Sequence, residues 1–291
     1  MSRRIARSYL FVPANRPERI AKAQAAGADA VIVDLEDAVA PADKDRARDG
    51  LAAHLNPAAP VLVRVNGPDT EWFERDLEIG GHHGVAGVLV PKAEDVGHLH
   101  TARRRIGSDK VLLPLIETAR GFDRARTLAE SGLAERLMFG FIDFQLDLHL
   151  DDDPDALLYF RSQLVLISRL AGLPGPVDGV SVAIEDAERV RRETLYAKGL
   201  GFGGKLCIHP KQSPVVNACF RPTDEEIAWA KRVLDATAAS KGSAVAVDGK
   251  MVDVPVIRKA EEILESVSSE QSVARRAPRV TSHAVPTKVG R

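Results

Sequence analysis

The chain is 291 residues long, 45% of them hydrophobic and 28% charged, with a formal net charge of −1. That length can bury a sizeable core, either as one large α/β barrel or as two smaller domains. A charge so close to neutral gives no general attraction to nucleic acid or to an anionic membrane, so we expect neither as a partner.

Cysteine usage and the N-terminal segment indicate a cytoplasmic protein. Cys207 and Cys219 are the only cysteines, and they form no CxxC pair that would suggest a disulfide framework or a cysteine-rich zinc site. The basic start, residues 1–7, is not followed by the apolar segment of a signal peptide. No apolar run approaches the roughly 20 residues that span a bilayer.

Short apolar runs alternate eight times with longer segments in which apolar residues recur every three or four positions. This alternation indicates parallel strands covered by helices. Eight β/α units in about 210 residues favour a closed (β/α)8 TIM barrel, and an open doubly wound sheet is the alternative. The predicted strands are residues 8–13, 30–36, 61–65, 87–92, 111–117, 137–143, 178–184 and 205–209.

A further segment follows the eighth predicted strand. The pattern predicts a helix over 223–240, a short extended piece over 244–248 and a second helix over 255–266. We assign 1–220 to the barrel and 221–266 to a C-terminal helical lid extension of the same domain. Residues 267–291 lack a sustained period, which predicts a disordered tail with a modest basic excess.

Several predicted strands end in charged or hydrogen-bonding side chains. A strand buried on both faces cannot carry such groups in its middle without a large desolvation cost. At the C-terminal ends they ring the mouth where barrel enzymes place their catalytic groups. These residues are Asp34, Glu36, Asp37, Arg64, Asn66, Lys92, Glu117, Asp143 and His209.

Glu117 and Asp143 close adjacent predicted strands, so their carboxylates can converge. Converging carboxylates repel, which raises one pKa or demands a cation, and two oxygen ligands completed by waters suit Mg²⁺ or Mn²⁺. The alternative is that each caps the helix after its strand. Asp147 is a second possible ligand, or a first-turn carboxylate favoured by the helix dipole.

Arg64 lies among apolar residues and needs an acidic or oxyanionic partner. Its guanidinium could hold a carboxylate or a developing enolate oxygen, or form a buried ion pair with Asp34 or Glu36. Asp34, Glu36 and Asp37 could orient Arg64 or metal-bound waters from a second layer, or cap the next helix.

Two further residues have both a functional and a structural interpretation. Arg16 precedes Pro17 at a predicted helix start, where a phosphate or carboxylate could bind, although a solvated arginine fits equally well. His209 could act as a general acid or metal ligand, and a hydrogen-bonded structural histidine is the simpler interpretation.

Together these segments resemble the CoA-ester lyase branch of the HpcH/HpaI aldolase and citrate lyase β-subunit family. The resemblance covers about residues 8–266, in order and at compatible spacing. It rests on residues 8–13 with 16–19, 34–39, 64–66, 91–92, 116–118, Gly140 with Asp143, and 204–205 with 208–210.

The resemblance implies a TIM barrel that forms trimers or hexamers and binds Mg²⁺ through Glu117 and Asp143. It implies that Arg64 contacts the thioester and enolate oxygens. Asp253 matches a lid aspartate that enters the neighbouring subunit's site, and Arg16 and Lys22 are expected to hold the phosphates of CoA.

The sequence departs from the family pattern at two places. Ala183 stands where relatives commonly carry an aspartate, and Phe141-Ile142 is bulkier than the small or polar pair often found before the second metal ligand. Both changes leave the metal pair intact, and they put the usual substrate in doubt.

The predicted function is Mg²⁺-dependent cleavage of a malyl-, citramalyl- or citryl-CoA type thioester into a 2-oxo acid or glyoxylate plus acyl-CoA. A class II aldolase acting on free hydroxy-oxo acids is one alternative. A citrate lyase β-subunit that needs an acyl-carrier partner is another, and a non-catalytic metabolite-binding regulator is a third.

Overall fold

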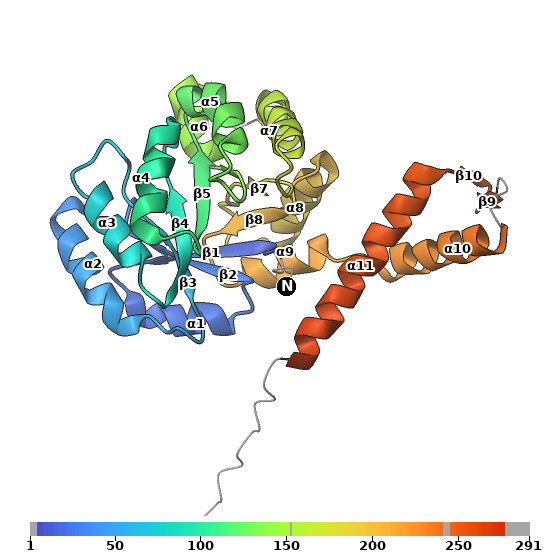
Figure 1. The fold of residues 1–291 in the computed structure, drawn as a ribbon, viewed down its shortest axis with the longest axis horizontal. Coiled ribbons are helices and arrows are strands. Elements are labelled where there is room, and N and C mark those ends of the chain that lie inside the picture. The colour runs from blue at the N-terminus through green and yellow to red at the C-terminus, as the bar shows by residue number, and fades with distance from the viewer. Residues whose placement is uncertain (1–4, 152, 241–244, 277–291) are drawn as a thin grey trace, which may run out of the picture. The chain divides into compact units, whose positions relative to one another are not determined.

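Eight parallel strands close into a barrel in chain order, because β1 is hydrogen-bonded to both β2 and β8 (Figure 1). The computed structural model describes residues 5–151, 153–240 and 245–276. The closed sheet confirms the predicted (β/α)8 fold and excludes the open sheet. The strands are β1 Ser8–Pro13, β2 Ala30–Asp34, β3 Val61–Arg64, β4 Val85–Val90, β5 Val111–Ile116, β6 Met138–Phe139, β7 Val177–Asp178 and β8 Gly204–Cys207.

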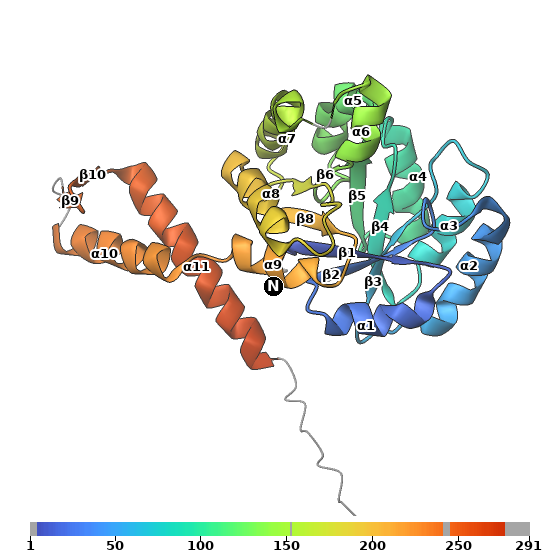
Figure 2. The same ribbon diagram turned by 180° about the vertical axis from the view of Figure 1, so that it is seen from behind.

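Helices surround this barrel, as the views from front and back show (Figures 1 and 2). Asp95, Thr118 and Asp186 cap three of them by accepting a backbone N–H of the first turn. The α-helices of this unit are α1 Ile20–Ala25, α2 Lys44–Leu51, α3 Phe73–Gly80, α4 Val96–Ile106, α5 Ala119–Glu130, α6 Phe141–Leu148, α7 Leu158–Leu170, α8 Ala187–Leu200 and α9 Gln212–Phe220. Short 3-10 helices are η1 Pro17–Arg19, η2 Pro41–Asp43, η3 Ala52–His54 and η4 Pro154–Leu157.

Alternate strand residues face opposite sides of the barrel wall, which separates the apolar side chains into two cores. The larger core lies between strands and helices and includes Leu10, Val33 and Val63. The smaller core fills the barrel interior. Its buried members are Tyr9, Ile32, Leu62, Leu89, Leu113, Leu115, Met138, Val177 and Leu206.

The sixth and seventh strands are much shorter than the sequence predicts. The apolar run that was expected to be strand through Asp143 turns at Gly140 into α6, so Asp143 lies in the first turn of a helix. The seventh strand ends at Asp178 instead of beginning there. A short apolar run fits a strand and a buried helix equally well, and packing decides between them.

The described residues after Phe220 form a second compact unit. Its helices α10 Asp224–Ser240 and α11 Val254–Arg276 share a small core of Ala230, Val233 and Ala260. Strands β9 Val245–Val247 and β10 Lys250–Val252 pair as an antiparallel hairpin. Helix α11 continues to Arg276 and so includes the first part of the segment for which the sequence predicts a tail, 267–291. The rest of that tail, 277–291, lies outside the described residues.

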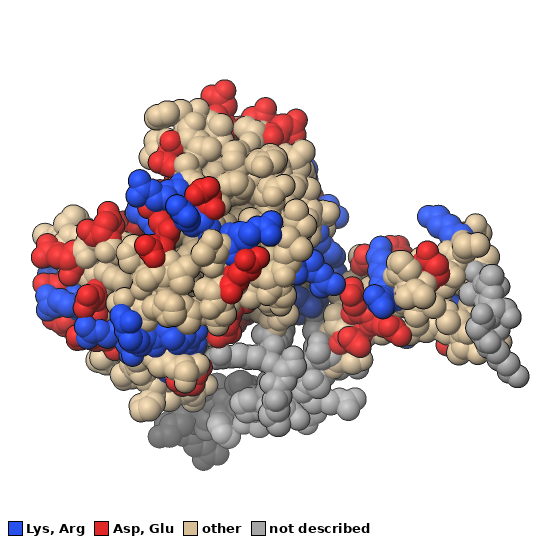
Figure 3. Space-filling view, turned by 45° about the horizontal axis from the view of Figure 1, so that its top comes forward, with Lys and Arg blue, Asp and Glu red and all other residues tan. Residues whose placement is uncertain are grey.

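Charged side chains of both signs are interspersed on the face of the molecule shown in Figure 3. This mixture accords with the nearly neutral net charge. No helix within the described residues combines the length and apolar character needed to cross a membrane.

Gly87 lies where β4 packs closely against β5 in the barrel wall. A Cβ at this position would overlap the carbonyl and side chain of Val111 in β5, whereas a Cβ at Gly50 in α2 would meet nothing within 4 Å. We expect Gly87→Ala to lower the free energy of unfolding by about 3 kcal/mol through overpacking. Gly50→Ala should raise it by about 0.5 kcal/mol through helix propensity. Urea unfolding measures both, and equal midpoints for the two variants would contradict the strand contact.

Candidate active site

The polar residues at the barrel mouth continue the inward-facing positions of their strands. Asp34, Arg64 and Glu117 each follow, two residues later, a side chain of the interior core. Because strand side chains alternate, all three point toward the barrel axis at the C-terminal ends. The interior residues that set this direction are Ile32, Leu62 and Leu115.

Arg64 is held by a fork of hydrogen bonds to Asp34. Its Nε and Nη2 donate to the two carboxylate oxygens of Asp34 at 2.7 and 2.6 Å. Its Nη1 lies 3.0 Å from Glu36 Oε2 and 3.1 Å from Asp37 Oδ2. The structure therefore confirms the buried ion pair that the sequence suggested, and it places all three predicted second-layer carboxylates around one guanidinium.

The loop after β2 is fixed from both sides. Asp34 accepts the backbone N–H groups of Glu36 and Ala38 at 2.9 and 3.2 Å. The buried Lys44 ammonium donates to the carbonyl oxygens of Leu35 and Glu36 at 3.0 and 2.9 Å. These carboxylates therefore organise Arg64 and their own loop, while the N-terminus of α2 has no side-chain cap.

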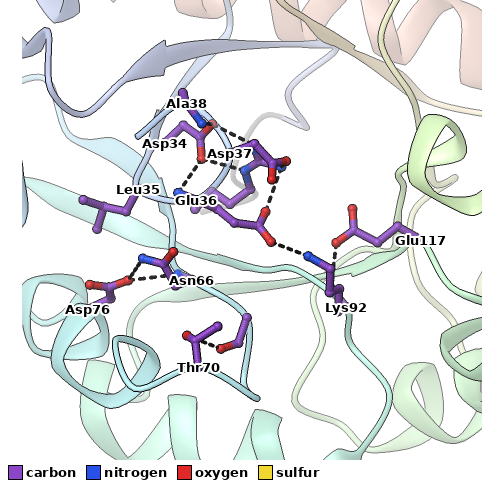
Figure 4. Close-up of polar contacts among 12 residues, drawn as sticks. Asp34, Leu35, Glu36, Asp37, Ala38, Asn66, Thr70, Asp76, Lys92 and Glu117 are labelled. Atoms are coloured by element: carbon purple, nitrogen blue, oxygen red, sulfur yellow. Dashed lines mark hydrogen bonds and ion pairs between the residues drawn. The ribbon is translucent and has the colours of Figure 1, made fainter. Parts of the chain in front are cut away.

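Lys92 connects two carboxylates of the mouth, as Figure 4 shows. Its ammonium donates to Glu36 Oε1 at 2.8 Å, and its backbone N–H donates to Glu117 Oε1 at 2.8 Å. Lys92 adopts a left-handed φ of 44°, which is uncommon for a residue with a side chain. The sequence marked Lys92 only as a strand-end residue, because its backbone role depends on that local conformation.

The pKa values of Glu117 and Asp143 are both raised. Burial and the nearby Glu36 and Asp143 carboxylates raise the pKa of Glu117 to about 8. Burial and the charge of Asp37 raise the pKa of Asp143. Helix capping does not explain Glu117, because Thr118 caps α5 and Glu117 instead accepts from Lys92.

The mouth forms a cavity of about 490 Å³, into which both carboxylates open. Arg64 and Asp37 line it together with Glu117 and Asp143. A small acid with an attached apolar group fits a cavity of this size and mixed lining. The remaining lining residues are Phe11, Pro13, Asp34, Ala38, Leu115, Gly140, Phe141, Ile142, Gly179, Val180, Leu206 and Ile208.

The donor set fits a hard divalent cation. Five carboxyl groups meet only three cationic side chains at this mouth, which are Arg64, Lys92 and Lys44. Gly140 leaves room beside Glu117, since a Cβ there would lie 2.6 Å from Oε2. Among the described residues no group of three or more His, Cys, Asp or Glu is placed to hold a metal ion. Glu117 and Asp143 would supply two of the six or more oxygen ligands that such a cation takes, and substrate and water would supply the others.

Two polar residues singled out in the sequence have structural roles. Asp147 Oδ2 accepts the backbone N–H of Ala119 at 2.7 Å, so this carboxylate stabilises the start of α5. Asn66 donates its backbone and side-chain N–H to the buried Asp76 at 2.9 and 2.6 Å. Neither lines the cavity.

Among the remaining candidates of the barrel unit, Arg16, Lys22 and His209 do not line the cavity. Arg16 is about half exposed and forms an ion pair with Glu18 at 2.7 Å, and Lys22 is exposed on α1. His209 Nδ1 accepts from the backbone of Lys211. Asp253, in the second unit, accepts from Val256 at the start of α11. The functional roles of Arg16, Lys22 and Asp253 stay predictions.

Comparison with known proteins places this geometry in a family. The chain is 37% identical over 276 residues to a citrate lyase subunit beta-like protein of Deinococcus radiodurans, covering 89% of this chain and 96% of that one. It is 36% identical over 256 residues to (3S)-malyl-CoA thioesterase of Cereibacter sphaeroides, covering 85% and 89%.

A solved structure matches with a TM-score of 0.78 and 37% identity, over 90% of this chain and 98% of the other. It is the protein CitE of Mycobacterium tuberculosis in complex with magnesium, acetoacetate and coenzyme A. The family model HpcH/HpaI aldolase/citrate lyase matches residues 7–210. The chain thus belongs to the HpcH/HpaI aldolase/citrate lyase family.

Proposed function

We propose that this protein is a Mg²⁺-dependent carbon–carbon lyase for a 3-hydroxyacyl-CoA thioester of the malyl, citramalyl or citryl type. One observation carries the proposal: Glu117 and Asp143 open into the same cavity as the buried guanidinium of Arg64. This arrangement offers a cation site for an acid and a fixed donor group for a second, developing oxyanion.

The relatives support the CoA-ester class. The CitE structure from Mycobacterium tuberculosis contains magnesium, acetoacetate and coenzyme A together. Another relative is named a (3S)-malyl-CoA thioesterase, so its substrate is a thioester of a hydroxy acid. Magnesium for this chain, with manganese as a possible substitute, follows from these neighbours and from the carboxylate pair described above.

The chemistry requires that the bond between the hydroxyl-bearing carbon and the acyl α-carbon break. A divalent cation held by Glu117 and Asp143 supplies Lewis acidity toward the carboxylate and hydroxyl oxygens of the substrate. A solvent water takes the hydroxyl proton, and the oxygen becomes the carbonyl of the 2-oxo acid or glyoxylate. The electron pair of the broken bond moves into the thioester, where it forms an enolate.

Arg64 would stabilise that enolate oxygen. Two of its five N–H groups donate to Asp34, which fixes the plane of the guanidinium. A donor that is already oriented costs no reorganisation as charge develops, so it favours the transition state over the bound substrate. Asp34 is thus a positioning residue for Arg64.

Asp253 is proposed as the acid that protonates the α-carbon of the enolate, which completes release of acyl-CoA. We further propose that the protein is a homotrimer or hexamer in which Asp253 serves the neighbouring subunit's site. Arg16 and Lys22 would pair with the CoA phosphates.

Three other activities are outcomes of the same assays. A class II aldolase would cleave free hydroxy-oxo acids without CoA. A citrate lyase β-subunit would need an acyl-carrier partner, and a metabolite-binding regulator would be inactive throughout. Hydrolysis of the thioester, as in the Cereibacter relative's name, would release free CoA.

The first prediction concerns the metal and Asp143. With malyl-CoA, citramalyl-CoA and citryl-CoA, wild-type protein should release a 2-oxo acid or glyoxylate plus acyl-CoA in Mg²⁺ and lose this activity in EDTA. Asp143→Ala should lower kcat at least about a thousandfold, because it removes one of two cation ligands. Asp147→Asn is the matched control, since Asp147 lies on the same helix and serves α5.

Product analysis separates the alternatives. Cleavage of free acids but not thioesters would favour the aldolase, and activity only after addition of an acyl-carrier protein would favour the subunit. No product from any substrate would contradict a stand-alone lyase. An equal loss of activity in Asp147→Asn and Asp143→Ala would contradict the assignment of Asp143 as a cation ligand.

The second prediction concerns the pH dependence of metal binding. Without a cation the pKa of Glu117 is about 8, so below that pH a proton competes with the metal. Mg²⁺ affinity should therefore rise about tenfold per pH unit from roughly pH 6 and level off near pH 8, with about one proton released. Calorimetry in buffers of different ionisation enthalpy measures both quantities, and a constant affinity over this range would contradict proton competition at Glu117.

The third prediction concerns Asp253. Asp253→Asn keeps an oxygen that can accept from Val256, so α11 should stay capped while turnover falls about a hundredfold or more through loss of proton transfer. Asp248→Asn in the same hairpin is the control. Mixed oligomers of Asp253→Asn and Asp143→Ala should recover up to about a quarter of wild-type activity, since only intersubunit sites can combine both intact residues. Unchanged turnover in Asp253→Asn would exclude it as the proton donor.

A further inference from the structure

A second cavity lies on the outer side of the barrel wall, next to the proposed active site. It measures about 460 Å³ and is lined by Arg161 of α7, Tyr196 of α8, Asp178 and Lys205. Asp178 and Lys205 each neighbour a residue of the interior core, so strand alternation turns their side chains toward the helices. Nothing in the proposed lyase mechanism uses this space.

The outer cavity is lined by four cationic side chains and three carboxylates, which are Arg161, Arg189, Arg192 and Lys205 on one side and Asp153, Asp178 and Glu193 on the other. Arg161 Nε and Lys205 Nζ share the single carboxylate of Asp178, at 3.0 and 2.8 Å. All three side chains are buried. Lys205 also donates to the carbonyl oxygen of Gly179 at 2.8 Å. Four cationic side chains against three carboxylates leave one positive charge unbalanced in the lining, which favours one additional carboxylate in this cavity.

Among the described residues, Phe141 alone lines both cavities. Phe141 follows β6, and β6 and β7 are the shortest strands of the barrel, with two residues each. Three neighbours fix its ring: the Arg161 guanidinium lies 5.0 Å from its centroid, the Phe139 ring lies 6.4 Å away, and Gly179 leaves room where a Cβ would overlap it. Phe141 is therefore a held partition between the cavities.

We propose that Phe141 limits the length of the 2-oxo acid that the active site accepts. With Phe141 in place the acid ends inside the mouth, so short acids such as glyoxylate and pyruvate fit. Removal of the ring joins the two cavities and brings a longer chain toward Arg161 and Lys205, where a terminal carboxylate is favoured. This inference rests on the proposed function, since it takes the 2-oxo acid as the ligand of the Glu117–Asp143 site.

Calorimetric binding of 2-oxo acids in Mg²⁺ and in EDTA tests the partition. The ligands are pyruvate, 2-oxoglutarate and 5-methyl-2-oxohexanoate, which has the shape of 2-oxoglutarate without its second charge. Wild-type protein should bind pyruvate at least about tenfold more tightly than either long acid. Phe141→Ala should keep pyruvate binding within about threefold and bind 2-oxoglutarate about tenfold more tightly than wild type, with a smaller gain for the uncharged acid.

Ile208→Ala is the matched control, because Ile208 lines the mouth but neither the outer cavity nor the small hollow of Phe141, Ile142, Arg189 and Glu193 beside it. It should leave the preference for pyruvate over 2-oxoglutarate unchanged. Phe141→Leu, a smaller truncation, provides a second variant and should shift the preference in the same direction.

The outcomes separate the inference from the proposed function. Suppose that wild type binds pyruvate and that both Phe141 variants keep the wild-type preference for pyruvate over 2-oxoglutarate. This result would overturn the role of Phe141 and leave the proposed function standing. Equal gains in Ile208→Ala and Phe141→Ala would also overturn it, since any enlargement of the mouth would then be enough. If wild type binds no 2-oxo acid in a Mg²⁺-dependent way, the proposed function fails and the inference fails with it.

Discussion

The fork between Arg64 and Asp34 is the interaction on which the rest of the mouth depends. It joins the ends of β2 and β3, whose residues Asp34 and Arg64 are also paired across the sheet. Burial of an unpaired guanidinium would cost a large desolvation free energy. The two carboxylate oxygens of Asp34 offset this cost because they accept from its planar N–H donors. The loop that carries Glu36 and Asp37 folds back on the same pair, so Arg64 is oriented before any ligand arrives.

The same clustering of charge explains why the mouth suits a cation. Lys92 and Arg64 lie against Glu36, yet burial raises the pKa of Glu36 as well as the pKa values of Glu117 and Asp143. A divalent ion held by Glu117 and Asp143 would stabilise both carboxyl groups as anions. The proposed site would thus combine the ion pairs around Arg64 with two carboxyl groups that bind a cation.

The wall of the barrel is uneven, and this unevenness bears on specificity. Strands β1 and β4 have six residues each, while β6 and β7 have two. Where the strands are short, Phe141 takes over the separation between the mouth and the space under α7 and α8. The Phe141 side chain, which the buried Arg161 contacts, thereby separates the barrel mouth from the space under the helices at this point.

The sequence by itself determined the barrel and much of its mouth. Eight apolar runs at barrel spacing, each followed by helical periodicity, leave few ways to bury the strands. Asp34, Arg64 and Glu117 could be predicted to converge, because each continues an inward-facing position at a strand end. The family could be recognised because these motifs occur together in one order.

Only the tertiary structure decided the rest. Asp143 was expected at a strand end and lies in the first turn of α6, since the apolar run around it fits strand and helix alike. The bridging role of Lys92 follows from its left-handed backbone, which local sequence did not reveal. Arg161, Asp178 and Lys205 come from α7, β7 and β8, so their shared burial depends on packing between distant segments, which no local pattern encodes.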